Sequence, residues 1–259
     1  LKRLSRLIRE SDATLTLAAD SATVVAGLSR QATQDGLTIR VLVEMDSGMG
    51  RCGTQSPQQT LQLAQEIDRL PGLEFMGVMT YPSMESMAPF IDEVRTLMDG
   101  AGLPLHMVSG GGTGEEEISK ALGCTEVRIG SYAYEGMTRI KERSDLNPER
   151  CSLRLVVTVV SAGHHDHVIV DAGMKALASY PPLPYGYCIE YPEIWFEKTY
   201  VEHGELNVNG SSHRFEVGDV MSFIPLHGGM TTNLHNRMFP VRNGEVVDEW
   251  EVAGRGRSQ

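Results

Sequence analysis

The sequence predicts an α/β fold over residues 1–148 and a second, mostly antiparallel β domain over residues 149–259. Up to Pro148, short apolar segments with strand character alternate with segments of helical periodicity, and the loops between them are short. After Pro148, helical periodicity is lost, and strands follow one another with turn residues between them. Two domains also agree with the length, because 259 residues with 41% hydrophobic content can bury a sizeable core.

The first part of the chain alternates between helix and strand. Apolar residues at helical spacing predict a helix over residues 1–10. Neither a capping residue nor an initiator methionine precedes it, so we expect the chain to begin inside a larger architecture. The next predicted elements are a strand at 15–19, a helix at 22–33 capped by Asp20-Ser21, and an apolar strand at 41–45.

Two further helix starts are indicated by capping patterns. Ser56 is followed by Pro57 and by Gln59 at the capping-box position, and Thr113 is followed three residues later by Glu116. The first of these helices ends at Pro71-Gly72 and the second at Ala121. The other predicted elements are a strand at 75–81, a helix from Phe90 to Gly100, and strands at 106–108 and 126–129. This alternation implies parallel strands with right-handed crossovers, in a barrel or an open doubly wound sheet.

The C-terminal part predicts strands without intervening helices. They cover 153–160, 168–170, 195–201 and 221–224. Asn243-Gly244, between Val241 and Val246, predicts a tight hairpin turn, because Asn and Gly tolerate the positive φ that such turns need.

Bulk properties narrow the class of protein. The formal net charge of −11 argues against nucleic acid or an anionic membrane as a partner. No apolar run approaches the ~18 residues of a membrane span, and no signal-peptide pattern opens the chain. The 4 cysteines lie far apart without a CxxC pair, as expected for free thiols in a reducing compartment. We therefore expect a cytoplasmic protein.

The strand at 41–45 leads into a loop with the pattern G-x-G-x-x-G, from Gly48 to Gly53, which raises the possibility of a dinucleotide site. In that fingerprint the glycines form the helix N-terminus that receives the pyrophosphate. Here the helix start at Ser56 falls after the last glycine, and Arg51 sits inside the loop. Both features argue against a dinucleotide, and the alternative is a glycine-rich turn.

A second glycine run, from Gly110 to Gly112, leads into the helix that starts at Thr113. Consecutive glycine amides can converge on an anion, and the helix dipole favours negative charge there. The three glutamates at 115–117 count against phosphate, because acids in the first turn already satisfy the dipole. Phosphate binding and a plain turn both stay open. Phosphate requires the glycine amides to face the ligand and the glutamates to face water.

Several blocks, in order, resemble the D-threonine aldolase and D-serine dehydratase family, which contains pyridoxal-phosphate enzymes of the alanine racemase-like fold. These blocks are residues 43–53, 109–113, 126–132, 170–175, 225–235 and 254–257. The resemblance covers nearly the whole chain and is specific for the family, though not for one reaction. It implies a (β/α)8 TIM-type barrel that carries the cofactor, a C-terminal, mostly antiparallel β domain, and a homodimer.

The resemblance also implies which residues bind pyridoxal 5'-phosphate. Tyr81, at the end of its strand, is expected to contact the pyridine ring, and Arg51 to lie near the ring edge. The alternatives are a half-buried strand tyrosine and an ion pair of Arg51 with Asp46 or Glu44. The other implied cofactor-binding residues, the first five of them phosphate ligands, are Ser109, Gly110, Gly111, Gly130, Ser131 and Tyr132.

The chain departs from the family pattern at the Schiff-base lysine. That lysine lies on an early barrel strand in a His-x-Lys-Thr-His-type segment, which no segment of this chain matches. The lysines present are Lys2, Lys120, Lys141, Lys175 and Lys198. We expect the first strand–helix units, and the catalytic lysine with them, to come from an N-terminal segment or a separate chain, because a partial barrel leaves two raw sheet edges.

The metal and base positions also depart from the family. Its divalent metal is bound by His-x-Cys or His-x-Asp in the β domain. The matching positions here are His227 and Gly229, and glycine offers no ligand atom. A divalent metal is therefore left open, and the histidines at 164, 165 and 167 are expected to be solvated. The loop at 82–87 lacks the histidine that helps the aldolases deprotonate the substrate β-hydroxyl.

From the resemblance we expect a pyridoxal-phosphate-dependent lyase that acts on a small D-β-hydroxy amino acid, by retro-aldol cleavage or dehydration. A racemase, or another metal-independent pyridoxal-phosphate reaction, is the alternative within the class. The metal and the base are the parts of the family site that act on the β-hydroxyl, and this chain departs from the family pattern at both. A non-catalytic cofactor-binding relative is the alternative outside it, because the lysine is missing.

Overall fold

The computed structural model describes residues 1–137, 140, 147–179 and 183–257. The chain divides into two compact units, Leu1–Gly130 and Ser131–Gln259, and each has its own hydrophobic core. The predicted domain bounds, 1–148 for the barrel portion and 149–259 for the β domain, stay a prediction. In the described ranges, no helix is long and apolar enough to cross a membrane.

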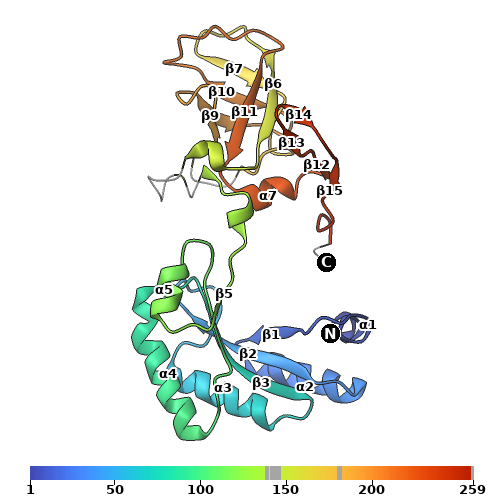
Figure 1. Ribbon diagram of the computed structural model, residues 1–259, viewed down its shortest axis with the longest axis vertical. Coiled ribbons are helices and arrows are strands. Elements are labelled where there is room, and N and C mark those ends of the chain that lie inside the picture. Colours follow the sequence, from blue (N-terminus) through green and yellow to red (C-terminus); the bar gives the residue numbers. More distant parts are fainter. Residues whose placement is uncertain (138–139, 141–146, 180–182, 258–259) are drawn as a thin grey trace. The chain divides into compact units, whose positions relative to one another are not determined.

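The first unit alternates helices with parallel strands (Figure 1). Its helices are α1 (Lys2–Glu10), α2 (Ala22–Asp35), α3 (Pro57–Arg69), α4 (Ala88–Ala101) and α5 (Glu116–Ala121). Its strands are β1 (Thr16–Ala19), β2 (Ile39–Asp46), β3 (Leu73–Tyr81), β4 (Met107–Gly110) and β5 (Glu126–Val127). The five strands pair in sequence order, and every pair is parallel. This is the arrangement found in the wall of a TIM-type barrel, as the sequence predicts.

The core of this unit lies between the sheet and its helices. β2 contributes Val41, Val43 and Met45, all at most 1% exposed, which suits a central parallel strand covered on its faces. α2, α3 and α4 pack in turn against one another, and α2 and α3 also pack on β2 and β3. Each helix turns an apolar stripe inward, such as Ile91, Val94 and Met98 of α4.

Only one of the two predicted capping boxes caps its helix. The Ser56 hydroxyl accepts the Gln59 amide at 3.2 Å and caps α3. The prediction for Thr113 is wrong. α5 begins at Glu116, and the Thr113 hydroxyl instead accepts the amide of Gly130 at 3.1 Å. Gly114, with φ 93°, keeps the intervening residues in a turn and delays the helix.

The cap predicted for α2 is also not made by a side chain. Ser21 is the N-cap residue but makes no side-chain capping hydrogen bond. The Asp20 carboxylate accepts the amide of Gly53 at 3.1 Å instead, and so ties the end of β1 to the loop after β2.

A bulge lies in the middle of β3. Val41 pairs with Phe75 and the next residue, Leu42, pairs with Gly77, so Met76 is an extra residue in the strand. Gly77 has φ 137°, and a Cβ there would lie 2.0 Å from the Met107 carbonyl oxygen. Glycine therefore allows β3 and β4 to approach closely at this point.

The second unit is built mainly from antiparallel strands. Its larger strands are β6 (Leu155–Ser161), β7 (His167–Val170), β8 (Gly186–Cys188), β9 (Trp195–Thr199), β10 (Gly204–Asn207) and β11 (Val220–Pro225). They form one sheet in the order β8-β11-β6-β7-β10-β9. The end strands β8 and β9 also contact each other, so the sheet is nearly closed, and Phe196 packs on Phe223 inside it at 4.7 Å between ring centroids.

Smaller elements complete this unit. They are the 3-10 turns η2 (Ser131–Ala133) and η3 (Pro148–Arg150), helix α7 (Gly228–Thr232), and strands β12 (Arg237–Met238), β13 (Val241–Arg242), β14 (Glu245–Val246) and β15 (Trp250–Glu251). The predicted hairpin is confirmed, because Val241 pairs with Val246 and both turn residues, Asn243 and Gly244, have positive φ. β8, β10 and α7 were not predicted. The two strands are short, and the glycines and threonines of α7 are poor helix formers.

Candidate functional site

The predicted site residues of the first unit lie at the carboxyl ends of neighbouring parallel strands. β2 ends at Asp46, β3 at Tyr81 and β4 at Gly110. Asp46 and Tyr81 are partners in the register of the sheet. Barrels and open α/β sheets bind their ligands at this end of the strands, so the structure brings these residues to the expected edge.

The loop after β2 is folded around the carboxylate of Asp46. Asp46 Oδ1 accepts the amides of Gly50 at 3.1 Å and Gly48 at 3.0 Å, and these bonds, with that from Gly50 foremost, hold the pKa of Asp46 below its usual value. Gly53 has φ 112°, and a Cβ there would lie 2.3 Å from the Asp46 nitrogen. α3 begins only at Pro57, so these glycines do not form a helix N-terminus, which agrees with the interpretation against a dinucleotide.

Arg51 extends from this loop over the ring of Tyr81. Its Cζ lies 5.2 Å from the ring centroid, within cation–π range. Its Nη2 is also 4.0 Å from Glu44 Oε1, so the alternative of an ion pair with Glu44 is present alongside the ring contact. Tyr81 is 39% exposed, which leaves ring surface open to a ligand.

The second glycine run already holds an anionic oxygen from the chain itself. Glu115 Oε2 accepts the amides of Ser83 at 2.7 Å and Gly112 at 2.8 Å. The amide of Gly111 donates to Ser83 Oγ at 2.8 Å, and a Cβ on Gly111 would lie 1.9 Å from Glu115 Oε2. Phosphate binding was predicted on the condition that the glutamates face water, and Glu115 does not meet this condition.

Ser109 takes part in a hydrogen-bonded network with two residues that were not predicted as site residues. Its hydroxyl donates to Glu126 Oε1 at 2.5 Å and accepts from Arg128 Nη1 at 2.6 Å. Arg128 Nη2 also donates to the carbonyl of Thr80 at 2.9 Å, so one guanidinium joins the ends of β3 and β4. The only signal for Arg128 in the sequence was its place inside the block 126–132.

The remaining predicted residues lie in the second unit. Ser131 begins η2, where its carbonyl accepts the amides of Tyr134 and Glu135 at 3.1 and 2.8 Å, and Tyr132 is 60% exposed. His227 Nδ1 accepts the amide of Met230 at 3.2 Å and caps α7, so one of its ring nitrogens is engaged. The assignment of His227 as a metal ligand stays a prediction.

The structure also shows where the lysines of the described ranges lie. Lys175 pairs with Glu202 at 2.6 Å and Lys198 with Glu205 at 3.0 Å, all in the second unit. Lys2 lies in α1 and Lys120 in α5, and Lys141 lies outside the described residues. In the described ranges, therefore, no lysine ends one of the parallel strands.

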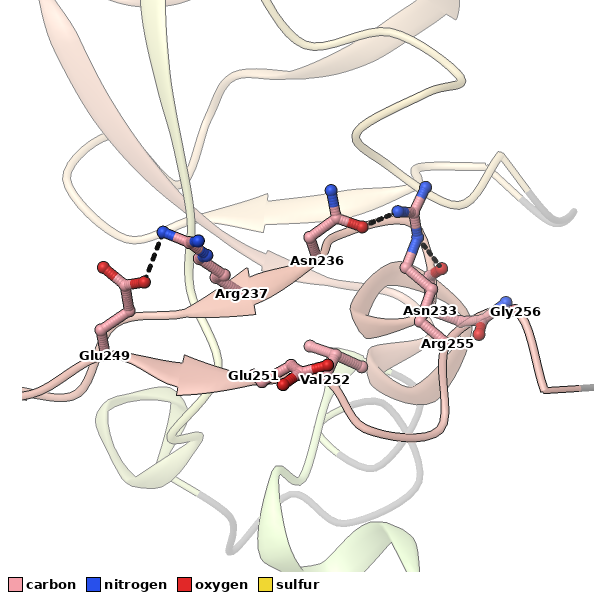
Figure 2. Close-up of a pocket in the computed structure, with 8 residues that line it drawn as sticks. All are labelled: Asn233, Asn236, Arg237, Glu249, Glu251, Val252, Arg255 and Gly256. Atoms are coloured by element: carbon pink, nitrogen blue, oxygen red, sulfur yellow. Dashed lines mark hydrogen bonds and ion pairs between the residues drawn. The ribbon is translucent and has the colours of Figure 1, made fainter.

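The second unit also contains a polar pocket (Figure 2). Its lining residues are Asn233, Asn236, Arg237, Glu249, Glu251, Val252, Arg255 and Gly256. Arg237 pairs with Glu249 at 2.5 Å, and Arg255 donates to the Asn233 carbonyl at 3.1 Å and to Asn236 Oδ1. Because both arginines already have partners, the pocket is not assigned a ligand.

The first unit brings together backbone amides, an aromatic ring and a guanidinium, which are the groups that would hold a phosphorylated aromatic cofactor, and Glu115 occupies two of the amides. The amides of Ser83 and Gly112 bind a carboxylate oxygen, so this loop accepts negative charge. Next to it, a Cβ on Gly112 would lie 3.1 Å from Tyr81 Cε2, so the glycine run approaches the tyrosine ring edge closely. An anion-binding loop, an aromatic ring and the guanidinium of Arg51 thus lie together at one sheet edge.

Known proteins resemble the chain along most of its length. Residues 2–137 match the family model of the alanine racemase N-terminal domain, and residues 152–241 match the serine dehydratase domain. A D-threonine aldolase of an Arthrobacter species is 32% identical over 265 residues, covering 95% of this chain and 69% of that protein. A 3-hydroxy-D-aspartate aldolase of Paracoccus denitrificans is 30% identical, covering 99% of this chain and 70% of that protein.

The fold has solved counterparts as well. The crystal structure of a D-threonine aldolase from Filomicrobium marinum superposes with a TM-score of 0.88 at 24% identity, covering 99% of this chain and 73% of that chain. The likeness of fold therefore extends over both units.

Proposed function

The chain belongs to the alanine racemase N-terminal domain family, and from this membership we propose that it is a pyridoxal-phosphate-dependent lyase acting on a small D-β-hydroxy amino acid. Its relatives named above are aldolases for D-threonine and 3-hydroxy-D-aspartate. The observation that carries the proposal is the grouping of Arg51, Tyr81 and the anion-binding glycine run at the ends of adjacent parallel strands. The reaction is retro-aldol cleavage or dehydration.

Each residue of the site has a role in the proposal. When bound, pyridoxal phosphate supplies an electron sink for the substrate α carbon. Tyr81 and Arg51 are proposed to contact the pyridine ring, with Glu44 orienting the guanidinium of Arg51. Ser109, Gly110, Gly111 and Gly130 of the first unit are proposed to hold the phosphate, and the assignments of Ser131 and Tyr132 stay predictions from the resemblance.

The proposal includes a second piece of barrel that carries the catalytic lysine. Within the described residues, β1 pairs only with β2 and β5 only with β4, so each edge of the parallel sheet has one strand without a second neighbour. An N-terminal segment or a separate chain that pairs with these edges would close the barrel. We also propose that the protein is a homodimer and that it lies in the cytoplasm. A divalent metal at His227 is not required by it, because Gly229 has no ligand atom.

Cofactor binding by the chain tests the assignment of Arg51. Pyridoxal phosphate should shift its absorption band saturably on titration with the chain, and Arg51→Ala should raise the dissociation constant about tenfold through loss of a partly exposed cation–π contact and a charge. The dissociation constant of Arg51→Lys should lie between those of the unaltered chain and of Arg51→Ala, since lysine keeps the charge but not the planar group. Arg69→Ala, at the end of α3, is the control and should not change binding. Equal affinities for Arg51→Ala and Arg69→Ala would remove Arg51 from the site.

The reaction is tested on the chain joined to its barrel-completing segment. D-Threonine, D-serine and 3-hydroxy-D-aspartate are compared, and glycine with an aldehyde indicates aldol cleavage, whereas a 2-oxo acid with ammonia indicates dehydration. The epimer at the α carbon with its hydroxyl intact, which for D-serine is L-serine, indicates a racemase and rejects the lyase. Reduction with borohydride should attach the cofactor to a lysine outside residues 1–259. A labelled peptide from within them contradicts that assignment.

A further inference from the structure

The loop between β6 and β7 gathers imidazole and carboxylate groups in the β domain. Residues 164–167 read His-His-Asp-His. One nitrogen of His164, one nitrogen of His167 and one oxygen of Asp166 all lie within 4.8 Å of one another. Over the described part of the chain, this is the only group of three such side chains that converges in this way. The cluster belongs to neither the candidate cofactor site nor the His227 position.

The sheet holds the backbone of two of the three residues. His167 is the first residue of β7 and pairs with Asn207 of β10, and its side chain is only 23% exposed. The Asp166 carbonyl accepts the amide of Val208 at 3.0 Å, and its carboxylate oxygen Oδ1 lies 2.8 Å from His167 Nδ1. These two residues are therefore already paired before any cation binds, and a cation that takes the same two atoms replaces their hydrogen bond.

His164 lies on the loop and completes the group. Its ring stacks on that of His167, with centroids 4.1 Å apart and an interplanar angle of 20°. Zinc is usually bound tetrahedrally at about 2.0–2.2 Å from nitrogen and oxygen ligands, which separates two ligand atoms by about 3.3–3.6 Å. The ligand atoms here lie within 4.8 Å of one another, so the His164 ring has to rotate out of its stack on His167 for its nitrogen to reach a shared cation.

The ligand types select the cation. Imidazole nitrogens suit zinc, nickel and copper, whereas magnesium and calcium prefer sites built from oxygen alone. We infer that His164, Asp166 and His167 bind a divalent cation of the zinc type, with at least one further position open to water or to an added ligand. A bound cation would join the loop to β7 and so raise the melting temperature of the β domain.

The test uses the full chain, stripped of metal and without pyridoxal phosphate, so that its outcome is independent of the proposed function. Zinc is titrated in competition with a chromophoric chelator, and cobalt is added to follow visible absorption bands. We expect one equivalent of zinc to bind and to raise the melting temperature. His164→Ala and His167→Ala should each raise the dissociation constant tenfold or more and abolish the temperature shift.

Matched controls come from neighbouring and competing histidines. His165→Ala removes an exposed imidazole from the same loop and should leave zinc affinity unchanged. His227→Ala should also leave it unchanged. Circular dichroism of each variant shows whether it is folded. Asp166→Asn keeps the side-chain shape but removes the charge, and we expect it to bind zinc more weakly as well. The inference is overturned if the double variant His164→Ala/His167→Ala binds zinc as tightly as the unaltered chain, or if His165→Ala or His227→Ala causes the loss.

Discussion

Glu115 is the residue whose position departs furthest from expectation. Three consecutive glutamates at the start of a helix indicate solvated side chains that satisfy the helix dipole, but the first of them turns back to the amides of Ser83 and Gly112. No local pattern could have indicated this, because Ser83 lies 32 residues earlier in the chain. The carboxylate therefore occupies donors that a phosphate could use.

We predict that Glu115→Gln increases affinity for inorganic phosphate and for pyridoxal phosphate by about five- to tenfold, because one negative charge leaves the loop. The same change should lower the free energy of unfolding by about 1 kcal/mol, since charge-assisted hydrogen bonds become neutral ones. Phosphate titrations and urea unfolding measure the two effects. Glu117→Gln is the matched control, with the same charge change on an exposed side chain. Weaker phosphate binding in Glu115→Gln would show that the carboxylate organises the site and does not compete for it.

Asp46 makes the loop after β2 sensitive to acid. Hydrogen bonds from Gly50 and Gly48 lower the pKa of this carboxyl in the folded state. Its stabilising contribution is therefore fully present above the usual carboxyl pKa and is lost as the pH falls through the lowered value. Hydrogen-exchange protection of the Gly48 and Gly50 amides, corrected for intrinsic rates, should fall in that range. In Asp46→Asn the same amides should show no such step, and a step that persists there would assign it to another group.

At the residue scale, the resemblance predicted that Arg51 and Tyr81 both lie near the cofactor ring, but not that they contact each other. The structure brings them together because Asp46 and Tyr81 end adjacent strands. The contacts of Arg128 could not be predicted, because its partners are a hydroxyl and a carbonyl on two other strands and nothing local marks them. Whether these residues bind the cofactor stays a prediction.

At the scale of elements, capping patterns were reliable only where no glycine interrupted them. The Ser56 pattern is followed by Pro57, whose fixed φ suits the first turn, and the helix begins there. The Thr113 pattern contains Gly114, whose positive φ lies outside the helical region, and the helix begins later. Strand–helix alternation predicted parallel strands, which is confirmed, but it left the strand order open between a barrel and a doubly wound sheet, and the structure shows sequential order.

Two glycine substitutions test how closely β3 and β4 approach. Gly77→Ala should lower the free energy of unfolding by more than about 2 kcal/mol, because its Cβ would lie 2.0 Å from the Met107 carbonyl and φ is positive. Gly100→Ala, in α4, has nothing within 4 Å of the added Cβ and should instead stabilise by about 0.5–1 kcal/mol. Chemical denaturation measures both variants. A tolerated Gly77→Ala would mean that the two strands can separate without cost.

At the scale of the whole molecule, two separate cores predict two unfolding events. The buried side chains of one core all come from residues 19–122 and those of the other from residues 155–223. The sequence indicated this division through the loss of helical periodicity. It could not give the near-closure of the β sheet, since β8 and β10 are too short to be recognised as strands and β8 pairs with β11, which lies far along the chain.

The cysteines report on these events separately. Cys52 and Cys124 are half-buried in the first unit, and Cys151 and Cys188 are buried in the second. Burial raises the pKa of Cys188 to about 12, so at pH 8 the folded protein should leave it unlabelled by thiol reagents. Pulse labelling across a denaturant gradient, read by mass spectrometry, should show Cys52 and Cys124 becoming reactive in one transition and Cys151 and Cys188 in another. A single shared transition would show that the two cores unfold together.

Met76, the extra residue in β3, determines which face of the sheet each later side chain of the strand occupies. Side chains of a strand alternate between its two faces, so one inserted residue exchanges the faces for everything that follows. Thr80 and Tyr81 therefore owe their orientation to an insertion four and five positions earlier. Deleting Met76 would keep the composition of the strand end but rotate Tyr81 away from Arg51. Adding or removing one residue within β3 therefore exchanges the faces of the residues that follow, whereas a change of two residues keeps them.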